Sequence, residues 1–308
     1  MERRKNIGFL TGGIMDEMTK DLCTGILEEA ARDDVNIITL PIKYIYRDMS
    51  LSPNPYEYQY QTVVELITAE NIDVLIVSAD CIGCVTTSEK LNSFMDSLKE
   101  KGIPIILVAS RIDGYPGVSY DNKAGVLDGI KYLVENLGLK NICMITSADH
   151  STDTTERYDA YTESMEKYGL EIHHEKVTVS SPSSYCIKNC EDILDRNPDT
   201  EAIICINDSI ASAVYTVMQE RNLVPGKDIK VMGFDNSVQG SMLSPSLTTV
   251  DADAISLGRR SFSMVRLLLD GWNVGNMTVP TSFVLRDSFG SLLDSEDVYD
   301  RSEEHTSE

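Results

Sequence analysis

Paired cysteines are the residues of this chain whose spacing could most directly do chemistry. Cys81 and Cys84 are two residues apart, the spacing of redox-active thiol pairs, and they follow a predicted strand. A thioredoxin-like site needs a helix that begins within the motif, whereas Val85-Thr86-Thr87 precede the next predicted helix. We therefore interpret the pair as a plain turn, with a disulfide oxidoreductase as the enzymatic alternative.

Other catalytic and metal-binding motifs are missing from the sequence. Cys186 and Cys190 lie four residues apart on one helix face, but no histidine or further cysteine pair has matching spacing, so we expect no zinc. Thr11-Gly12-Gly13 follows the first predicted strand, yet no G-x-G-x-x-G, Walker lysine, G-x-S-x-G or H-E-x-x-H motif occurs. We predict no enzymatic activity and no cofactor.

Polar residues at the ends of predicted strands point to ligand binding instead. In parallel α/β sheets, ligands bind at the carboxyl ends of strands. The residues at these ends are Thr11-Gly12, Ala79-Asp80, Ser119–Asn122, Ser147–Ser151, Asn207-Asp208 and Asp235-Asn236, with Arg157 early in an adjoining helix. Such groups suit a small polar or polyhydroxylated ligand. Taken singly, Asn122, Asn207 and Asp208 could be helix N-caps and Arg157 a surface ion-pair partner; only the whole set indicates a site.

Alternating strands and helices must position these residues. The first array has predicted strands at 6–10, 36–40, 74–78 and 105–108 and helices at 16–33, 58–70, 88–101 and 122–137. The second has strands at 141–147, 172–179, 202–206 and 230–234 and helices at 153–168, 185–196 and 209–221; a helix at 253–270 and a strand at 279–287 close the chain. This alternation predicts an α/β fold with two doubly wound parallel-sheet lobes.

Chain length and net charge limit the classes of protein to which this chain can belong. At ~150 residues per domain, 308 residues favour two compact units. The net charge, 27 − 49 = −22, disfavours a grip on nucleic acid or an anionic membrane surface. No apolar run reaches the ~20 residues of a membrane span, and the apolar stretch Ile7–Leu10 is too short for a signal peptide. We expect a cytoplasmic protein, which its odd number of cysteines fits.

Two segments interrupt the alternation. Residues 41–60 carry several tyrosines and three prolines; we favour an insertion packed on one lobe, and a cover over a ligand is the alternative. The acidic tail, 291–308, lacks periodicity and is predicted to be disordered. Its last eight residues, 301–308, match the translation of a common sequencing adapter, so we favour an artefact over an ordinary acidic tail and expect the gene to continue beyond about Asp300.

Five segments resemble the effector-binding core of lac-repressor/galactose-repressor (LacI) type regulators. They are 118–125, 202–211, 231–236, 245–250 and 285–288, in family order within residues 5–290. The resemblance implies the periplasmic-binding-protein type I fold, whose lobes are joined by three crossovers, here near Gly138, Asp251 and Met277–Pro280. The N-terminal lobe is then 5–138 plus 251–278, and the C-terminal lobe is 139–250 plus 279–290.

The resemblance also implies roles for single residues. Arg157, Asn207 and Asp235 would hold ligand hydroxyls, Tyr185 would stack on a sugar ring, and Asp121 would lie near the cleft; Thr11 joins them from the strand-end pattern. Family repressors carry a helix-turn-helix before the first strand, but only six residues precede Ile7, so we expect no direct nucleic-acid contact by this chain. The stretch 74–83 is more similar to sensor modules that precede an output domain.

We therefore expect a small-molecule sensing domain of a bacterial signalling or regulatory protein. A sugar, nucleoside or other polar metabolite would close the lobes and control an output domain missing at the C-terminus: a diguanylate cyclase, a histidine kinase or an AraC-type domain. The alternatives are a LacI-type regulator whose DNA-binding part is absent, or a transporter's solute-binding protein. We also expect a homodimer, formed through the apolar face of the helix at 253–270 (Ile255, Leu257, Phe262, Val265, Leu268 and Leu269).

Overall fold

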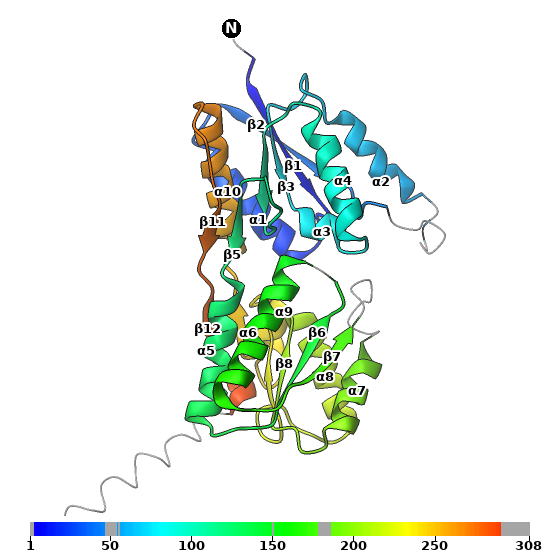
Figure 1. Cartoon of the computed structure of the whole chain (residues 1–308), viewed down its shortest axis with the longest axis vertical. Coiled ribbons are helices and arrows are strands. Elements are labelled where there is room, and N and C mark those ends of the chain that lie inside the picture. Colours follow the sequence, from blue (N-terminus) through cyan, green and yellow to red (C-terminus); the bar gives the residue numbers. More distant parts are fainter. Residues whose placement is uncertain (1–2, 47–53, 55, 150, 178–185, 291–308) are drawn as a thin grey trace, which may run out of the picture. The chain divides into compact units, whose positions relative to one another are not determined.

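The computed structural model describes residues 3–46, 54, 56–149, 151–177 and 186–290, and it divides into two compact units (Figure 1). Unit 1 comprises Met1–Asp121, Asp149–Thr155 and Asp253–Pro280; unit 2 comprises Asn122–Ala148, Glu156–Ala252 and Thr281–Glu308. The tail at 291–308, which we predicted to be disordered and to end in an adapter-derived stretch, lies outside the described residues.

Unit 1 is built on a six-stranded parallel sheet with the order β11-β5-β4-β3-β1-β2 (Figure 1). Its strands are β1 (Lys5–Thr11), β2 (Val35–Pro41), β3 (Val74–Val77), β4 (Ile105–Val108), β5 (Gly117–Tyr120) and β11 (Met277–Val279). The central strands β3, β4 and β5 are buried along their whole length. This burial is typical of a parallel sheet that helices cover on both faces.

The helices of unit 1 are α1 (Glu17–Ala30), α2 (Tyr58–Thr62), α3 (Ala79–Gly83), α4 (Ser88–Lys99) and α10 (Ala254–Leu269). Phe94, Met95 and Leu98 of α4 belong to one core cluster with sheet residues such as Leu75 and Leu107. We predicted one helix over 58–70. The structure has α2 followed by a 3-10 helix over Val63–Leu66, where β-branched residues lower the helix propensity.

The insertion at 41–60 packs on unit 1 in the part that is described. Ile42 and Ile45 are buried in the same core cluster as α4, and the ring of Tyr46 lies edge-on to Phe94 at 6.4 Å. Lys43 forms an ion pair with Glu57 across the insertion. These contacts agree with an insertion packed on one lobe; residues 47–53 and 55 lie outside the described residues.

Helices α1 and α10 cross at a pair of glycines. A Cβ atom on Gly25 of α1 would lie 2.0 Å from the carbonyl oxygen of Ile255, and one on Gly258 of α10 would lie 2.3 Å from that of Leu22. The backbones therefore touch, and Leu257 and Phe262 of α10 are fully buried within unit 1. Leu257, Phe262 and Val265 of the face that we predicted to form a dimer interface are therefore buried within unit 1 and unavailable to a second copy, whereas Leu269 of the same face is 37% exposed.

Unit 2 has a four-stranded parallel sheet in the order β7-β6-β8-β9. Its strands are β6 (Ile142–Ser147), β7 (His173–Val177), β8 (Ala202–Cys205) and β9 (Lys230–Met232), and β10 (Thr249–Asp251) pairs antiparallel with β12 (Ser282–Val284). Its helices are α5 (Asn122–Lys131, continued by a π-helix over Tyr132–Asn136), α6 (Thr152–Tyr168, which belongs to unit 2 from Glu156 on), α7 (Ile187–Arg196), α8 (Asp208–Glu220) and α9 (Val238–Met242). The predicted α/β fold with parallel sheets is confirmed.

Two predicted boundaries differ from the structure. The chain passes into unit 2 after Asp121, before α5, and not at Gly138. The reason is close packing: Gly125 and Gly129 bring α5 against Val250 and Met232, both in unit 2. The single strand predicted at 279–287 is instead β11, β12 and a short 3-10 helix over Asp287–Phe289.

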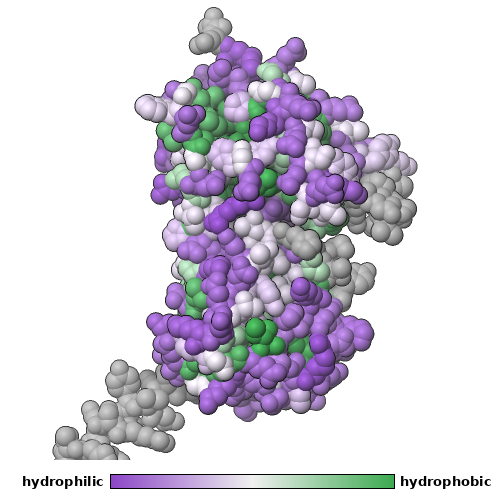
Figure 2. All heavy atoms as spheres, viewed as in Figure 1, coloured by the Kyte–Doolittle hydropathy of each residue, from purple (hydrophilic) through white to green (hydrophobic). Residues whose placement is uncertain are grey.

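The drawn surface is mostly hydrophilic, with hydrophobic residues in small separate groups (Figure 2). Single exposed apolar residues of this kind are common on folded proteins. Among the described residues, no helix combines the length and the apolar character needed to cross a bilayer.

The glycine crossing gives a stability prediction. Gly25→Ala places a methyl group against the backbone of α10 and should lower the free energy of unfolding by about 1–3 kcal/mol through overpacking. The control is Gly275→Ala, since a Cβ atom there meets nothing within 4 Å; it should change stability by less than about 0.5 kcal/mol. Urea denaturation measures both, and equal stabilities would contradict the packing described here.

Candidate functional site

The guanidinium group of Arg157 lies at the carboxyl edge of the unit 2 sheet. Arg157 projects from α6 and is only 6% exposed. Its Nη1 donates to the carbonyl oxygen of Ile206, directly after β8, at 2.9 Å, and its Nε donates to Oδ1 of Asn122 at 3.1 Å. The guanidinium carbon lies 3.4 Å from the ring centroid of Phe234. The main chain, an amide and an aromatic ring thus fix this cation in one orientation.

Asp235 brings an opposite charge to Arg157. Its Oδ1 lies 3.9 Å from Nη1 of Arg157, and 42% of its side chain is exposed. The backbone of Asp235 has φ +105°, outside the region that side-chain-bearing residues prefer. Such strain collects at functional sites, where the surrounding structure enforces it.

Asp208 supplies that surrounding structure. Its backbone N–H donates to the carbonyl of Phe234 at 2.8 Å. Its buried carboxylate accepts from the backbone N–H of Ser237 at 2.7 Å and from the Thr249 hydroxyl at 2.7 Å. Burial raises the pKa of Asp208, and these hydrogen bonds oppose the shift. Asp208 therefore binds Phe234, which precedes Asp235, and Ser237, which follows it by two residues.

The other predicted residues of unit 2 have mixed outcomes. Asn207 caps α8: its Oδ1 accepts from the backbone N–H of Ile210 at 2.9 Å. We predicted Asn122 to be a helix cap; in the structure α5 begins at Asn122, and its buried amide accepts from Arg157 and donates to Glu156 at 2.9 Å. Asn122 therefore supports the Arg157 site. Tyr185 lies outside the described residues.

Unit 1 places Thr11 and Asp121 at the carboxyl ends of β1 and β5. Thr11 is fully buried, and its Oγ1 has no hydrogen-bond partner in the described structure. The backbone N–H of Asp121 donates to the carbonyl of Val279 at 2.8 Å. Two strands of the sheet, β4 and β3, lie between β5 and β1. Unit 1 therefore does not bring these two residues together as neighbours.

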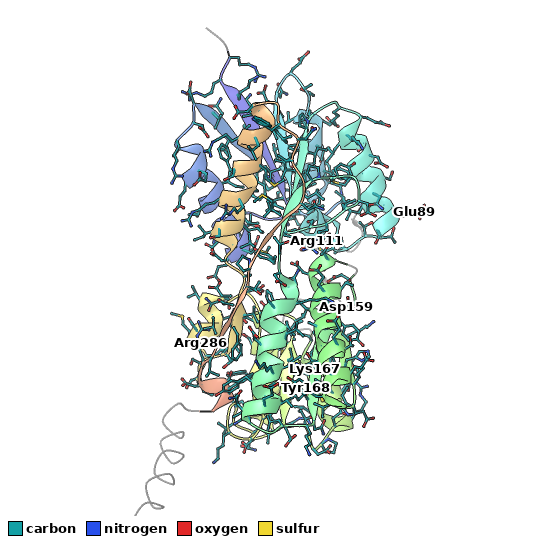
Figure 3. The ribbon with its side chains drawn as sticks, turned by 60° about the vertical axis from the view of Figure 1, so that its left-hand side comes forward. Glu89, Arg111, Asp159, Lys167, Tyr168 and Arg286 are labelled. Carbon is teal, nitrogen blue, oxygen red and sulfur yellow. The ribbon has the colours of Figure 1, made fainter. Side chains whose placement is uncertain are left out.

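Asp80 and Arg111 mark a polar cavity at the same edge of unit 1. The cavity has a volume of about 490 Å³ and is lined by Asp80, Ser88, Leu91, Asn92, Asp96, Arg111, Ile112, Asp113, Tyr115 and Thr152. Oδ2 of Asp80 accepts from the backbone N–H of Thr152 at 2.9 Å. Arg111, which Figure 3 labels, donates from Nε to the Ser119 hydroxyl at 2.7 Å.

Sequence reasoning named Asp80 as a strand-end residue but did not include it in the site, and it overlooked Arg111 and Thr152. Arg111 comes three residues after β4, so the strand-end pattern alone could have found it. Burial, reinforced by the nearby Asp153 and Asp149 carboxylates, raises the pKa of Asp80 to about 7. Asp80 therefore exchanges a proton near neutral pH.

The Cys81–Cys84 pair lacks the features of a thiol catalyst. We predicted a plain turn, but Cys81 lies in the short helix α3 and Cys84 follows its last residue. Burial raises the pKa of Cys81, although the backbone N–H groups of Gly12 and Gly13 donate to its sulfur, and burial raises the pKa of Cys84 to about 12. A nucleophilic thiol needs a lowered pKa. The backbone N–H groups of Gly12 and Gly13, which follow β1, therefore donate to the sulfur atom of Cys81.

Among the described residues, no group of three or more histidine, cysteine, aspartate or glutamate side chains is arranged to hold a metal ion.

Comparison with known proteins identifies relatives. A family model described as a periplasmic binding protein-like domain matches residues 130–289. The HTH-type transcriptional regulator RegA of Clostridium saccharobutylicum is 25% identical over 275 residues, which cover 87% of this chain and 76% of RegA.

Two solved structures show the same fold. The lac repressor dimer bound to operator and the anti-inducer ONPF aligns with a TM-score of 0.77 at 18% identity, covering 94% of this chain and 83% of that one. A complex of the transcriptional regulator CelR with cellobiose aligns with a TM-score of 0.74 at 16% identity, covering 92% and 85%.

The raised pKa of Asp80 gives a pH prediction. Because the folded state binds a proton that the unfolded chain has lost, stability should fall as the pH rises from about 4 to about 7, by at most ~1.4 kcal/mol per pH unit. Asp80→Asn should remove this part of the slope, whereas Asp113→Asn, at an exposed position of the same cavity, should keep it. Urea denaturation across this pH range measures the slopes; the same slope in Asp80→Asn and the parent would refute the assignment.

Proposed function

Because the chain belongs to the family of periplasmic binding protein-like domains, in the form that LacI-type regulators use to bind effectors, we propose that it senses a small molecule and controls transcription. The ligand is a small polar metabolite of the sugar or nucleoside class, held at the carboxyl edge of unit 2 by Arg157 and Asp235. Asn207, Tyr185, Asp121 and Thr11 remain further proposed contacts.

The observation that carries this proposal is the paired charge at Arg157. A buried guanidinium fork donates in fixed directions, and the exposed carboxylate of Asp235 beside it accepts. Together they can hold two adjacent ligand hydroxyl groups: one hydroxyl accepts a hydrogen bond from Arg157, and the other donates one to Asp235. Phe234 beneath the guanidinium leaves the fork little freedom to turn. A vicinal diol fits this arrangement better than an apolar or strongly cationic molecule.

The relatives support the same class of ligand. CelR was solved with cellobiose, and the lac repressor was solved on its operator with ONPF. For this chain we propose that ligand binding stabilises one of two arrangements of the chain in the cytoplasm, and thereby biases an output domain. That domain is a diguanylate cyclase, a histidine kinase or an AraC-type DNA-binding domain, and the alternative is the DNA-binding part of a LacI-type regulator. The ligand is released unchanged, without enzymatic turnover.

A test of the site compares three variants in unit 2. Thermal-shift screening of a sugar and nucleoside library identifies a binder, whose dissociation constant is then measured by calorimetry. Arg157→Ala and Asp235→Ala should each weaken binding about tenfold or more, because each removes a charged hydrogen-bond partner of the ligand hydroxyls, and a hydrogen bond to a charged group contributes ~1.5–3 kcal/mol. Asn122→Ala should weaken it too, since the amide orients Arg157.

The matched control is Arg196→Ala, which removes an exposed arginine of α7 that pairs with Glu175. It should bind like the parent. If Arg157→Ala and Asp235→Ala also bind like the parent, ligand recognition occurs elsewhere.

We also propose that the chain forms a homodimer, as the lac repressor does in its operator complex. Val238 and Met242 of α9 are 57% and 79% exposed, and a two-fold interface would cover them in both copies. Light scattering should give twice the chain mass of 34.2 kDa. Met242→Asp should shift the mass toward the monomer, and a monomeric parent protein would overturn the proposal.

A further inference from the structure

We propose that Arg286 is a positioning residue of the ligand site: it holds the turn that carries Asp235 and thereby orients the Asp235 carboxylate toward the ligand. Arg286, which Figure 3 labels, lies two residues after β12. Its guanidinium group reaches the turn through Asn236, the residue that follows Asp235. The effect on binding rests on the proposed function of Asp235, whereas the hold on the turn does not.

The turn between β9 and α9 contains two consecutive residues with positive φ. Asp235 has φ +105° and Asn236 has φ +52°. Asparagine tolerates the left-handed region, where φ is about +57°, but a φ of +105° lies outside the regions that residues with a side chain prefer. Such a conformation persists where contacts from the surrounding structure impose it. The direction of the Asp235 side chain therefore depends on the residues that bind this turn.

The guanidinium group of Arg286 binds both the turn and a buried part of the main chain. Its Nη2 donates to Oδ1 of Asn236 at 2.5 Å, and its Nη1 donates to the carbonyl oxygen of Leu247 at 2.9 Å. Leu247 is fully buried and lies two residues before β10. A planar guanidinium group presents its donors in fixed directions, which a lysine ammonium group does not. Arg286 therefore fixes the Asn236 side chain against a buried segment of unit 2.

The backbone of Arg286 is itself fixed by Thr248. The Thr248 hydroxyl accepts from the backbone N–H of Arg286 at 2.8 Å and donates to the backbone carbonyl of Arg286 at 2.9 Å. Thr248 is fully buried, and its own backbone N–H donates to the buried Ser288 hydroxyl at 2.7 Å. The guanidinium group thus projects from a rigid part of the chain, as a residue that orients another residue requires.

Further bonds hold the main chain of the same turn. The backbone N–H of Asn236 donates to Oγ1 of Thr249 at 3.3 Å, and this hydroxyl donates to Oδ1 of Asp208 at 2.7 Å. The backbone N–H of Asp235 donates to the carbonyl oxygen of Val250 at 2.9 Å. These bonds fix the main chain of the turn, and the guanidinium contact adds a hold on an adjoining side chain.

The consequence for the site is a separation of its two charges. Oδ1 of Asp235 lies 3.9 Å from Nη1 of Arg157, a distance longer than the ~2.7–3.2 Å of a hydrogen bond. In a looser turn the exposed carboxylate could close on the guanidinium group of Arg157, and the two charges would then bind each other in place of ligand hydroxyls. Arg286 keeps the carboxylate where a ligand hydroxyl can reach it.

Hydrogen exchange tests the hold on the turn in ligand-free protein. Arg286→Met removes both guanidinium bonds and should speed amide exchange in the peptide over 233–238 about tenfold or more. Asn236→Gly, which removes the acceptor while glycine keeps the positive φ, should do the same, so the test remains if Arg286→Met does not fold. Asn236→Asp should exchange like the parent, because aspartate tolerates this φ and accepts from Arg286.

The matched control is Arg221→Met, which removes another partly buried arginine of unit 2 that donates to a main-chain carbonyl, that of Glu191. It should leave exchange in this peptide unchanged. The parent rate in both Arg286→Met and Asn236→Gly would overturn the proposal.

A double-mutant cycle tests the role in binding, with the sugar or nucleoside found by the thermal-shift screen as the probe. Arg286→Met should weaken binding about tenfold in the parent chain. In Asp235→Ala it should weaken binding less than about twofold, because no carboxylate is left to orient. A loss of equal size in both backgrounds would indicate a general effect on unit 2 and would contradict the positioning role.

The two proposals can fail separately. If Asp235→Ala binds the probe like the parent, the ligand site is wrong, although faster exchange in Arg286→Met would still confirm the hold on the turn. If Asp235→Ala loses binding but Arg286→Met binds like the parent, the positioning role is wrong and the ligand site stands.

Discussion

The buried guanidinium group of Arg157 is the constraint on which the arrangement of unit 2 depends. A charge removed from water is costly unless hydrogen bonds and an opposite charge surround it. Here the partners come from the start of α5, the end of β8 and the end of β9. These three segments must reach one point, so the charge fixes the edge of the sheet where a ligand is expected.

In unit 1 the buried titratable group is an acid, Asp80, and its charged neighbours have the same sign. Asp80 accepts one backbone hydrogen bond from Thr152, and the neighbouring Asp149 and Asp153 add negative charge, so its carboxyl group holds a proton up to about neutral pH. The first residue of α6, Thr152, is therefore bound to a titratable group that follows β3. Both units place their strongest electrostatic features at the carboxyl ends of parallel strands, as expected for this class of sheet.

The sequence predicted most strands because buried parallel strands are short apolar runs, but it missed β5, whose Gly117 and Ser119 weaken that pattern. The strand-end pattern found Arg157 and Asp235 but not Phe234, since an apolar residue beneath a cation looks like core. The α10 face was assigned to a dimer because an amphipathic helix shows which face is buried, not which neighbour buries it; α1 is that neighbour.

A crystal structure of the chain with a bound sugar or nucleoside, found by screening, tests the central claim most directly. We predict two adjacent ligand hydroxyls within hydrogen-bond distance of Arg157 and Asp235, with the bonds from Arg157 to Asn122 and Ile206 intact. A ligand that is well ordered but touches neither Arg157 nor Asp235 would contradict the account.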